Sequence, residues 1–459
     1  MAIPESIVWL SPAWRRQFAG HLESIVRLAV PVVATRTGIL ILVAVDIAMT
    51  GRAGELELAY LSIGIAPQIL LLLIGIGMLF GTAVLVSQAD GAGEPHLCGR
   101  IWRLAAIHAL GMGVVFGGLC FGGEWFFNLV GQESGVARGG GDVMAMFGWG
   151  MPAIFLAVAT WLFLEGIGRP IPGMVVIIGA NLLNALLNWL FIYGNLGAPE
   201  MGATGAVLAT TIVRWVMAAV LVGYVLIMPG HDRYGVRGTM RGTWARARVF
   251  QRIGVPFAIA QGIEASAFSA VILFAGYIGT ASVGGYQIAQ NLIALAFMCA
   301  IGVGTATGVR VGNAVGRGDQ AGVRWAGWTG TFVVAVVMIF AGVLFLGAPE
   351  TLVGIYSQDA AVIAAAVPTV MVAAGMTVFD GAQGVLMSAL RGAGDIWIPV
   401  LFHCIAFWGF MVPAAALFAF TWGFGTPGLM LGAWVGVLIA SILLALRFHL
   451  ISNRQVRRL

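Results

Sequence analysis

The hydrophobic residues of this chain are gathered into twelve long segments separated by short polar connections. A transmembrane helix needs roughly 20 predominantly apolar residues. By that measure the pattern predicts twelve spanning helices, at about 22–49, 57–87, 100–122, 140–166, 170–194, 202–228, 250–277, 283–309, 322–346, 360–389, 396–421 and 427–450. The predicted fold class is therefore an all-α polytopic membrane protein with twelve transmembrane helices.

Composition indicates the same class of protein. Of the 459 residues, 60% are hydrophobic and 9% are charged, whereas a soluble domain carries about a quarter charged residues. The four cysteines, Cys98, Cys120, Cys299 and Cys404, are scattered through or near apolar segments. This spacing favours packing roles over a disulfide or metal site. No cleavable signal peptide is expected, because residues 1–21 lack a long apolar run.

The arginines indicate how the helices are oriented. All 24 basic residues are arginine. If both termini lie on one side of the membrane, only Arg52 and Arg138 fall in loops on the opposite side, while Arg36 and Arg214 lie within spans. Because arginine-rich loops face the cytoplasm, we expect both termini there. The positive net charge thus follows membrane topology and does not indicate a nucleic-acid partner.

The second half of the chain repeats the first at a shift of 225 positions. The matches are Pro31 with Pro256, Gly51 with Gly276, Gly54 with Gly279, Gly77 with Gly302, Gly91 with Gly316, Gly93 with Gly318 and Glu94 with Asp319. A further set, at a shift of 226, joins Leu164, Gly166 and Gly168 to Leu390, Gly392 and Gly394. The chain is therefore predicted to hold two copies of one unit.

Two copies that start from the same side of the membrane predict two pseudo-symmetric lobes of six helices each. The expected parts are a cytoplasmic N-terminal segment at 1–21, an N-lobe at 22–228, a cytoplasmic loop at 229–249, a C-lobe at 250–450 and a cytoplasmic tail at 451–459. Such repeats are common in transporters, which bind substrate near the bilayer midplane at the repeat interface. We therefore expect a substrate cavity between the lobes.

Three carboxylates qualify as acids expected at mid-bilayer depth: Asp46, Glu264 and Asp380. A charge at mid-bilayer costs about 2.5–3.5 kcal/mol on insertion scales, so each of them is a functional candidate. Asp46 could instead belong to a structural ion pair with Arg36 or Arg214. No basic residue is expected near Glu264 or Asp380 on either helix, which favours a role in binding a proton or a cation in turn.

Amide side chains share helix faces with two of these acids. Gln261 lies one turn before Glu264, and Gln383 lies one turn after Asp380. Two further stripes consist of Gln287, Gln290 and Asn291, and of Asn181, Asn184 and Asn188. Such stripes suit a water-lined substrate cavity, and they equally suit hydrogen bonds between helices. The sequence leaves both interpretations open.

An intramembrane aspartyl protease is a remote alternative. Residues 392–395 (GAGD) resemble the Gly-x-Gly-Asp signature of those enzymes, with Asp380 as the second acid. The equivalent run of the first half, 166–169 (GIGR), has no aspartate, so a turn shared by both repeats explains the glycines better. We find no P-loop, nucleophile elbow or metal-ligand spacing, and we do not expect an enzyme.

Taken in order, several runs resemble the MATE (multidrug and toxic compound extrusion) family, and within it the NorM-like bacterial branch. The runs are 45–52 (VDIAMTGR), 56–59 (LELA), 184–194 (NALLNWLFIYG), 196–206 (LGAPEMGATGA), 256–264 (PFAIAQGIE), 287–291 (QIAQN), 310–313 (RVGN) and 380–392. The likeness covers nearly the whole chain and rests on the order and spacing of the runs.

The resemblance implies an inner-membrane antiporter that exports cationic, often aromatic compounds by alternating access, driven by inward flow of Na⁺ or H⁺. By position, Glu264 and Asp380 match the C-lobe cation-binding acids, and Asp46 matches an N-lobe aspartate used for protonation or cation binding. Asn184 matches an N-lobe asparagine. Asn188 stands where many relatives have aspartate, which shifts the expected coupling site toward the C-lobe pair.

The sequence therefore predicts a secondary active multidrug efflux antiporter of the bacterial inner membrane. No cofactor is expected; the coupling ion is Na⁺ or H⁺, and Na⁺ would be bound by Glu264 and Asp380. The expected partners are small organic cations and drugs and the lipid bilayer, and we expect a monomer. Alternatives are a flippase for lipid-linked saccharides, for which only Arg36 and Arg214 could hold a pyrophosphate, and a passive channel.

Overall fold

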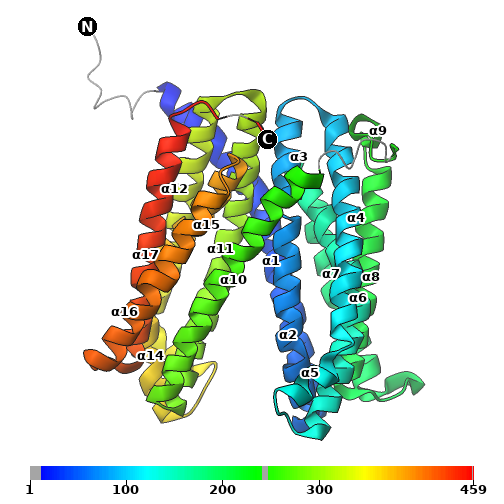
Figure 1. The fold of residues 1–459 in the computed structure, drawn as a ribbon, viewed down its shortest axis with the longest axis vertical. Helices are drawn as coiled ribbons and strands as arrows, with labels where there is room; N and C mark the ends of the chain where they lie inside the picture. Colours follow the sequence, from blue (N-terminus) through cyan, green and yellow to red (C-terminus); the bar gives the residue numbers. More distant parts are fainter. Residues whose placement is uncertain (1–11, 240–246, 457) are drawn as a thin grey trace. The chain divides into compact units, whose positions relative to one another are not determined.

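The computed structural model describes residues 12–239, 247–456 and 458–459. In this part of the chain every regular element is helical, and twelve helical spans are long and apolar enough to cross a bilayer (Figure 1). The predicted fold class and number of spans are confirmed, and the protein is a multi-pass membrane protein.

The helices follow the predicted order. The first half contains α1 (Pro12–Ala53), α2 (Glu55–Leu79), α3 (Gly81–Gly91), α4 (Pro95–Cys120), α5 (Gly123–Leu129), α6 (Ser134–Gly166), α7 (Ile171–Tyr193), η2 (Asn195–Gly197), α8 (Gly202–Ile227) and α9 (His231–Tyr234). The second half contains α10 (Ala247–Ile278), α11 (Thr280–Arg317), α12 (Gln320–Gly347), α13 (Pro349–Gly354), α14 (Ala360–Gly392), α15 (Trp397–His403), η4 (Cys404–Met411), α16 (Val412–Ala416), η5 (Leu417–Thr421) and α17 (Gly425–Ser452).

Several helices extend beyond the apolar segments that predicted them. Helix α11 continues to Arg317, so Arg310 and Arg317 lie on its last turns and not in a loop as the sequence suggested. A helix satisfies its own backbone groups whether lipid or water surrounds it, so the end of an apolar segment does not end the helix. Helix α11 ends at Arg317, because the next residue, Gly318, has a φ of 70°, outside the right-handed helical region.

Two spans are not continuous α-helix. The second span changes from α2 to α3 at Phe80, whose backbone N–H donates to Gly77 O at 3.2 Å. The eleventh span alternates α-helical turns with the π-helical segments η4 and η5. Both spans were predicted as single apolar segments, because hydropathy reports the length of a span and not its internal hydrogen bonding.

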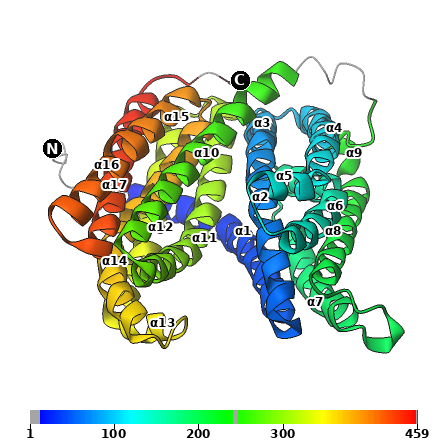
Figure 2. The same cartoon turned by 60° about the horizontal axis from the view of Figure 1, so that its bottom comes forward.

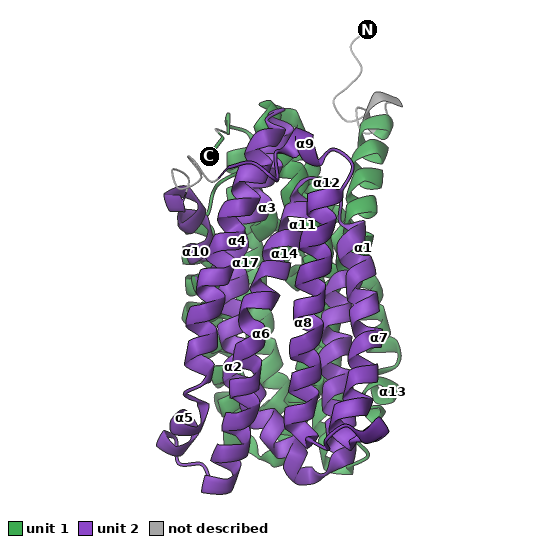
Figure 3. Ribbon diagram, turned by 90° about the vertical axis from the view of Figure 1, so that its right-hand side faces the viewer, with its two compact units in different colours: residues 1–33, 259–459 green, residues 34–258 purple. Residues whose placement is uncertain are grey.

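The chain forms two compact units, coloured separately in Figure 3. The described residues of unit 1 fall in the ranges 1–33 and 259–459, and those of unit 2 in the range 34–258. In unit 2, α6 packs against α2, α4 and α8; in unit 1, α14 packs against α11, α12 and α17 (Figures 1 and 2). Helices α6 and α14 are the fourth spans of the two repeats.

The backbone supports the repeat that the sequence predicts. Three pairs of matched glycines have nearly equal positive φ angles: Gly54 and Gly279 (153° and 149°), Gly93 and Gly318 (73° and 70°), and Gly168 and Gly394 (72° and 83°). L-residues with a side chain rarely adopt such angles. Glycine therefore occupies matching turns in the two repeats. The Gly-x-Gly runs at 166–168 and 392–394 are one such pair of turns.

Close helix packing repeats in the same way. A Cβ on Gly77 would lie 2.8 Å from the Cα of Ala258, and a Cβ on Gly302 would lie 3.1 Å from the Cα of Val33. Ala258 is the residue that the shift of 225 matches to Val33. The first part of α10 therefore packs in unit 2 and the first part of α1 in unit 1. The lobes expected from the sequence, 22–228 and 250–450, instead assign each of these two helices to a single lobe.

The approach of α4 to α6 in unit 2 gives a test of this packing. A Cβ on Gly113 would lie 2.3 Å from the Cα of Pro152, whereas Gly111, two residues away, has open space around it. Overpacking a close contact costs about 1–3 kcal/mol. We expect Gly113→Ala to lower the Tm of the purified protein in detergent and Gly111→Ala to leave it nearly unchanged. Equal Tm values for the two variants would contradict the contact.

Candidate functional site

Asp46 is held in unit 2 by hydrogen bonds from two other helices. Asn188 Nδ2 on α7 donates to Asp46 Oδ1 at 2.7 Å, and Thr210 Oγ1 on α8 donates to Asp46 Oδ2 at 2.6 Å. The carboxyl side chain is buried. Among the described residues, neither Arg36 nor Arg214 forms a salt bridge with it. Neutral donors, and not the ion pair weighed from the sequence, therefore satisfy both oxygens of Asp46.

The asparagine stripe on α7 joins three helices. Asn184 Nδ2 donates to Thr210 Oγ1 at 3.1 Å, and Asn188 Nδ2 also approaches Asn184 Oδ1 at 3.2 Å. Asn181 Nδ2 donates to the backbone oxygen of Gly38 in α1 at 3.0 Å. The stripe thus makes hydrogen bonds between helices, one of its two interpretations. A role in lining a substrate cavity stays a prediction.

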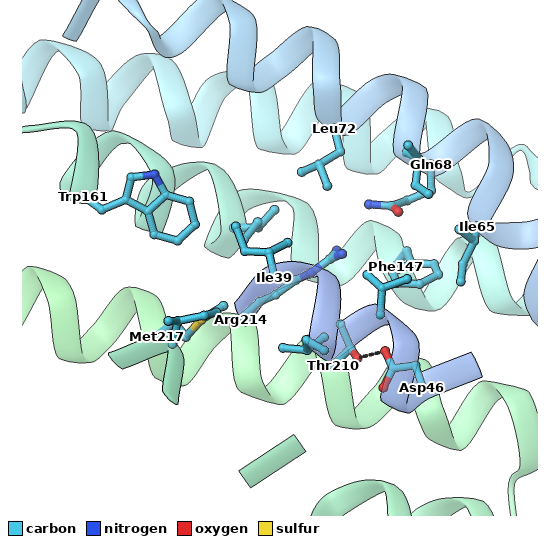
Figure 4. Close-up of a pocket in the computed structure, with 15 residues that line it drawn as sticks. Ile39, Asp46, Ile65, Gln68, Leu72, Phe147, Trp161, Thr210, Arg214 and Met217 are labelled. Carbon is cyan, nitrogen blue, oxygen red and sulfur yellow. Dashed lines mark hydrogen bonds between the residues drawn. The ribbon is translucent and has the colours of Figure 1, made fainter. Parts of the chain in front are cut away.

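A cavity in unit 2 lies between α1, α2, α6, α7 and α8 (Figure 4). Its volume is about 70 Å³. Its polar lining consists of Asp46, Gln68, Thr210 and Arg214, and the rest of its wall is apolar. Gln68 was not among the candidates from the sequence. A glutamine inside a predicted span was the signal that could have identified it.

Arg36 has a partner that sequence reasoning missed. Arg36 Nη2 lies 3.1 Å from Glu165 Oε1 on α6, and its guanidinium stacks over Trp161, 5.4 Å from the ring centroid. Glu165 is 4% exposed. It was not among the three acids singled out from the sequence, because it lies next to the end of its predicted span, 140–166. Arg36 is therefore a structural ion-pair partner of Glu165, and not of Asp46.

Unit 1 brings together two of the predicted acids and one predicted amide. Gln383 Nε2 donates to Asp380 Oδ1 at 3.1 Å, and both side chains are buried. Asp380 and Gln383 also interact with the half-buried Glu264 carboxylate on α10. Gln383 Oε1 is buried and has no hydrogen-bond partner among the described residues. The cluster therefore presents two carboxylates and one unpartnered amide oxygen.

A basic residue does lie near this cluster, contrary to the expectation from the sequence. Arg391, three turns after Asp380 on α14, interacts electrostatically with Glu264. Its Nε and Nη2 donate to Met387 O at 3.1 Å and to Ser388 Oγ at 3.0 Å. The error arose because Arg391, two residues past the predicted span 360–389, was counted among the cytoplasmic arginines, whereas α14 continues to Gly392.

The remaining predicted amides lie on α10 and α11 of unit 1. Gln290 Nε2 donates to Tyr286 OH at 3.2 Å, and Asn291 Oδ1 accepts from Tyr356 OH at 3.2 Å. Gln287 is exposed and Gln261 is half-buried. None of these four side chains contacts the Glu264 and Asp380 cluster through a hydrogen bond within the described ranges. Their part in a substrate cavity stays a prediction.

The acid of the Gly-x-Gly-Asp run has a structural role. Asp395 Oδ2 lies 2.7 Å from Arg447 Nε, in a partly buried salt bridge between the end of α14 and α17. Gly394 has a φ of 83°, so the glycines form a turn after α14. Asp395 thus pairs with an arginine in place of the second carboxylate that an aspartyl protease requires.

Two repeats of six spans, with a carboxylate–amide cluster in one unit and a cavity with polar groups in the other, are an arrangement common in membrane transporters. A model of the MatE family matches residues 31–190 and 256–417, once in each half. The chain therefore belongs to the MatE family. It is a transporter and not an enzyme.

The relatives cover nearly the whole chain. It is 31% identical over 437 residues to a probable multidrug resistance protein NorM of Caulobacter vibrioides, covering 95% of this chain and 92% of the relative. It is 32% identical over 456 residues to the protein of the same description from Xanthomonas campestris, covering 99% and 98%. The crystal structure of the eukaryotic MATE transporter AtDTX14 superimposes with a TM-score of 0.86 at 20% identity, covering 95% and 98%.

The Arg36–Glu165 pair predicts a change in stability. Removing one partner of a buried ion pair costs about 3–5 kcal/mol, because the other charge is left uncompensated. We expect Glu165→Gln to lower the Tm in detergent strongly, and the double substitution Arg36→Leu with Glu165→Leu to restore much of the loss. Asp395→Asn, in the more exposed pair with Arg447, is the matched control and should have a smaller effect. A double variant as unstable as Glu165→Gln would contradict this assignment.

Proposed function

We propose that this chain is a secondary active multidrug efflux antiporter that exports organic cations in exchange for Na⁺ or H⁺. The observation that carries the proposal is the cluster of Glu264, Asp380 and Gln383 within unit 1. The names of the relatives, probable multidrug resistance proteins, support drugs as the substrates. We place the protein in a bacterial inner membrane with both termini in the cytoplasm, because its arginines follow the positive-inside rule.

The cluster has the chemistry of a site for a small hard cation. Carboxylate and amide oxygens are the ligands that such cations prefer, and Gln383 Oε1 has no partner among the described residues. A proton could instead be held between the two acids, Glu264 and Asp380. In both cases the ion neutralises charge that the membrane interior disfavours. The two acids are thus suited to bind and release a cation in each transport cycle.

The same negative charge attracts a cationic drug, so ion and drug compete for the cluster. In a one-for-one exchange of monovalent cations no net charge crosses the membrane, and only the concentration gradient of the ion drives export. A tenfold ion gradient supplies about 1.4 kcal/mol, enough for a tenfold drug gradient. A second coupling ion per cycle would add about 2.3 kcal/mol per 100 mV.

A lipid-saccharide flippase is less well supported. A pyrophosphate headgroup requires several basic side chains in one cavity. Of the two intramembrane candidates, Arg36 is already paired with Glu165, so Arg214 alone lines the cavity of unit 2. The acidic cluster in unit 1 would repel such a headgroup. We therefore retain the cation antiporter.

Transport in proteoliposomes tests the coupling site. We expect Glu264→Gln and Asp380→Asn each to reduce ion-driven ethidium efflux to near background, because each removes a negative charge at the cluster. The matched control is Glu350→Gln, since Glu350 is an exposed acid at the start of α13. Ion-coupled efflux that persists in both cluster variants would contradict the assignment of the site.

Separate Na⁺ and pH gradients identify the ion. Efflux driven by Na⁺ alone would support Na⁺ binding at Glu264 and Asp380. Efflux driven by the pH gradient alone and lost in Asp46→Asn, but not in Glu264→Gln, would move the coupling site to unit 2. Efflux of ethidium under neither gradient would refute the antiporter proposal.

A further inference from the structure

The last turns of α11 carry two arginines on one face of the helix. Arg310 and Arg317 are seven residues apart, so they lie about 10 Å from one another along the helix axis. The two guanidinium groups interact electrostatically. Neither arginine forms a salt bridge with an acid in the part of the chain that the structure describes. The end of α11 therefore carries an excess of positive charge.

The first turns of α1, at the same end of unit 1 (Figure 1), add a third basic side chain. Arg310 Nη2 lies 3.3 Å from His21 Nδ1. Because a guanidinium only donates hydrogen bonds, Nδ1 accepts in this contact and the ring carries its proton on Nε2. The ring also stacks on Trp325 of α12, with 6.1 Å between the centroids and 11° between the planes. His21 is thus held between α11 and α12, with its Nε2–H left to donate.

The acid near this basic cluster, which consists of His21, Arg310 and Arg317, already has a structural role. Asp319 interacts electrostatically with His21, but its Oδ1 accepts from the backbone N–H of Gly322 at 2.8 Å as the N-cap of α12. Arg310 Nε is buried and has no hydrogen-bond partner among the described residues. The basic cluster therefore has more positive charge and more donors than its neighbours within the described ranges match.

A phosphate group matches the chemistry of the basic cluster. Arginine binds phosphate through paired, charge-assisted hydrogen bonds, which its planar group of donors favours. A phosphate oxygen also accepts from an imidazole N–H such as that of His21. Basic sites between transmembrane helices on the cytoplasmic side bind anionic lipid headgroups in this way. The arginine distribution places this end of unit 1 on that side.

An apolar surface continues from the basic cluster along α12. Trp328, Phe332 and Val336 follow Trp325 on one face of the helix, and all three are exposed. Phe18 on α1 packs against Phe332, with 5.6 Å between the ring centroids. Exposed apolar surface of this kind is typical of contact with a membrane. A phosphate bound at the basic cluster thus has room beside it for attached acyl chains, which favours a phospholipid over free phosphate.

We propose that His21, Arg310 and Arg317 bind the phosphate of an anionic phospholipid, whose acyl chains lie along the apolar face of α12. The site is separate from the cluster of Glu264 and Asp380, and it does not depend on which ion or drug the protein carries. A bound lipid joins α1 to α11 and α12, so it stabilises unit 1.

Lipid binding to the purified, delipidated full-length protein tests the proposal. Native mass spectrometry measures the affinities for phosphatidylglycerol and phosphatidylcholine with the same acyl chains, since both carry a phosphate and only the first has a net negative charge. We expect wild-type protein to bind phosphatidylglycerol about tenfold or more tightly than phosphatidylcholine. Arg310→Gln should remove most of this preference. Phosphatidylglycerol should also raise the Tm of wild-type protein more than that of Arg310→Gln.

Further variants separate the basic cluster from general surface charge. Arg317→Gln changes an exposed side chain, and it should lower the preference for phosphatidylglycerol about fivefold. His21→Phe keeps a ring beside Trp325 and removes the N–H donor, so a smaller loss is expected. The matched control is Arg454→Gln, at an exposed arginine that follows α17 in the same unit. It should leave the preference unchanged.

The ratio of the two affinities within one variant does not depend on the fraction of protein that is folded. An unchanged ratio in both Arg310→Gln and Arg317→Gln would overturn the proposal, and so would an equal loss in Arg454→Gln, which indicates general surface charge. If inorganic phosphate raises the Tm of wild type but not of Arg310→Gln, and phosphatidylglycerol raises neither, the lipid is the wrong source of the phosphate. Ion-driven ethidium efflux is measured separately, so none of these outcomes decides the antiporter proposal.

Discussion

The bilayer interior offers no water to polar groups, and this constraint accounts for the contacts at both candidate sites. Each buried polar atom must find a partner within the protein or remain open to a ligand. In unit 2, Arg36 is paired with Glu165, 129 positions away along the chain. Asp46 is satisfied by Asn188 and Thr210, from two other helices. These hydrogen bonds fix how α1 packs against α6, α7 and α8.

The two repeats share a backbone but place opposite charges at equivalent positions. Glu165 on α6 corresponds to Arg391 on α14 at the shift of 226, and the turns that follow them have the same left-handed glycine. In unit 2 the fourth span supplies the acid and the first span supplies Arg36. In unit 1 the fourth span of the repeat, α14, supplies Arg391, which interacts with Glu264 on α10, the first span of that repeat. One arrangement of helices thus gives a neutral ion pair in one unit. In the other unit, Asp380 adds a second acid and leaves an excess of negative charge.

Most of the fold could be predicted from the sequence, but only part of the sites. Hydropathy determines the number of spans because each must be long enough to cross the bilayer. The repeat is visible in the sequence because its turns need positive φ angles, which residues other than glycine rarely adopt. The partner of a polar residue was harder to predict. It depends on which helices lie side by side and on how each is rotated about its own axis. The hydropathy of a segment reports neither. Arg36 was therefore weighed as a partner of Asp46 and not of Glu165. Arg391 was counted among the cytoplasmic arginines and not as a neighbour of Glu264, and Gln68 was not considered.

The buried polar atoms of the two units differ in whether they have a hydrogen-bond partner. The carboxylate of Asp46 and the amide nitrogens of Asn181 and Asn184 have partners at 3.1 Å or less, so they stabilise helix packing without a ligand. Gln383 Oε1 and Arg214 Nη1 are buried without a partner among the described residues. An unmade buried hydrogen bond costs about 1–3 kcal/mol, so a group that binds at such an atom gains stability. Asn181 Oδ1 and Asn188 Oδ1 are also buried without a partner in the described part of the chain, so only the neighbouring charges single out a candidate ligand site. An oxygen beside two acids suits a cation, whereas Arg214 already has the electrostatic interaction with Asp46. Unit 1 therefore holds a candidate site for a cation, whereas unit 2 holds a buried arginine at the wall of a mostly apolar cavity.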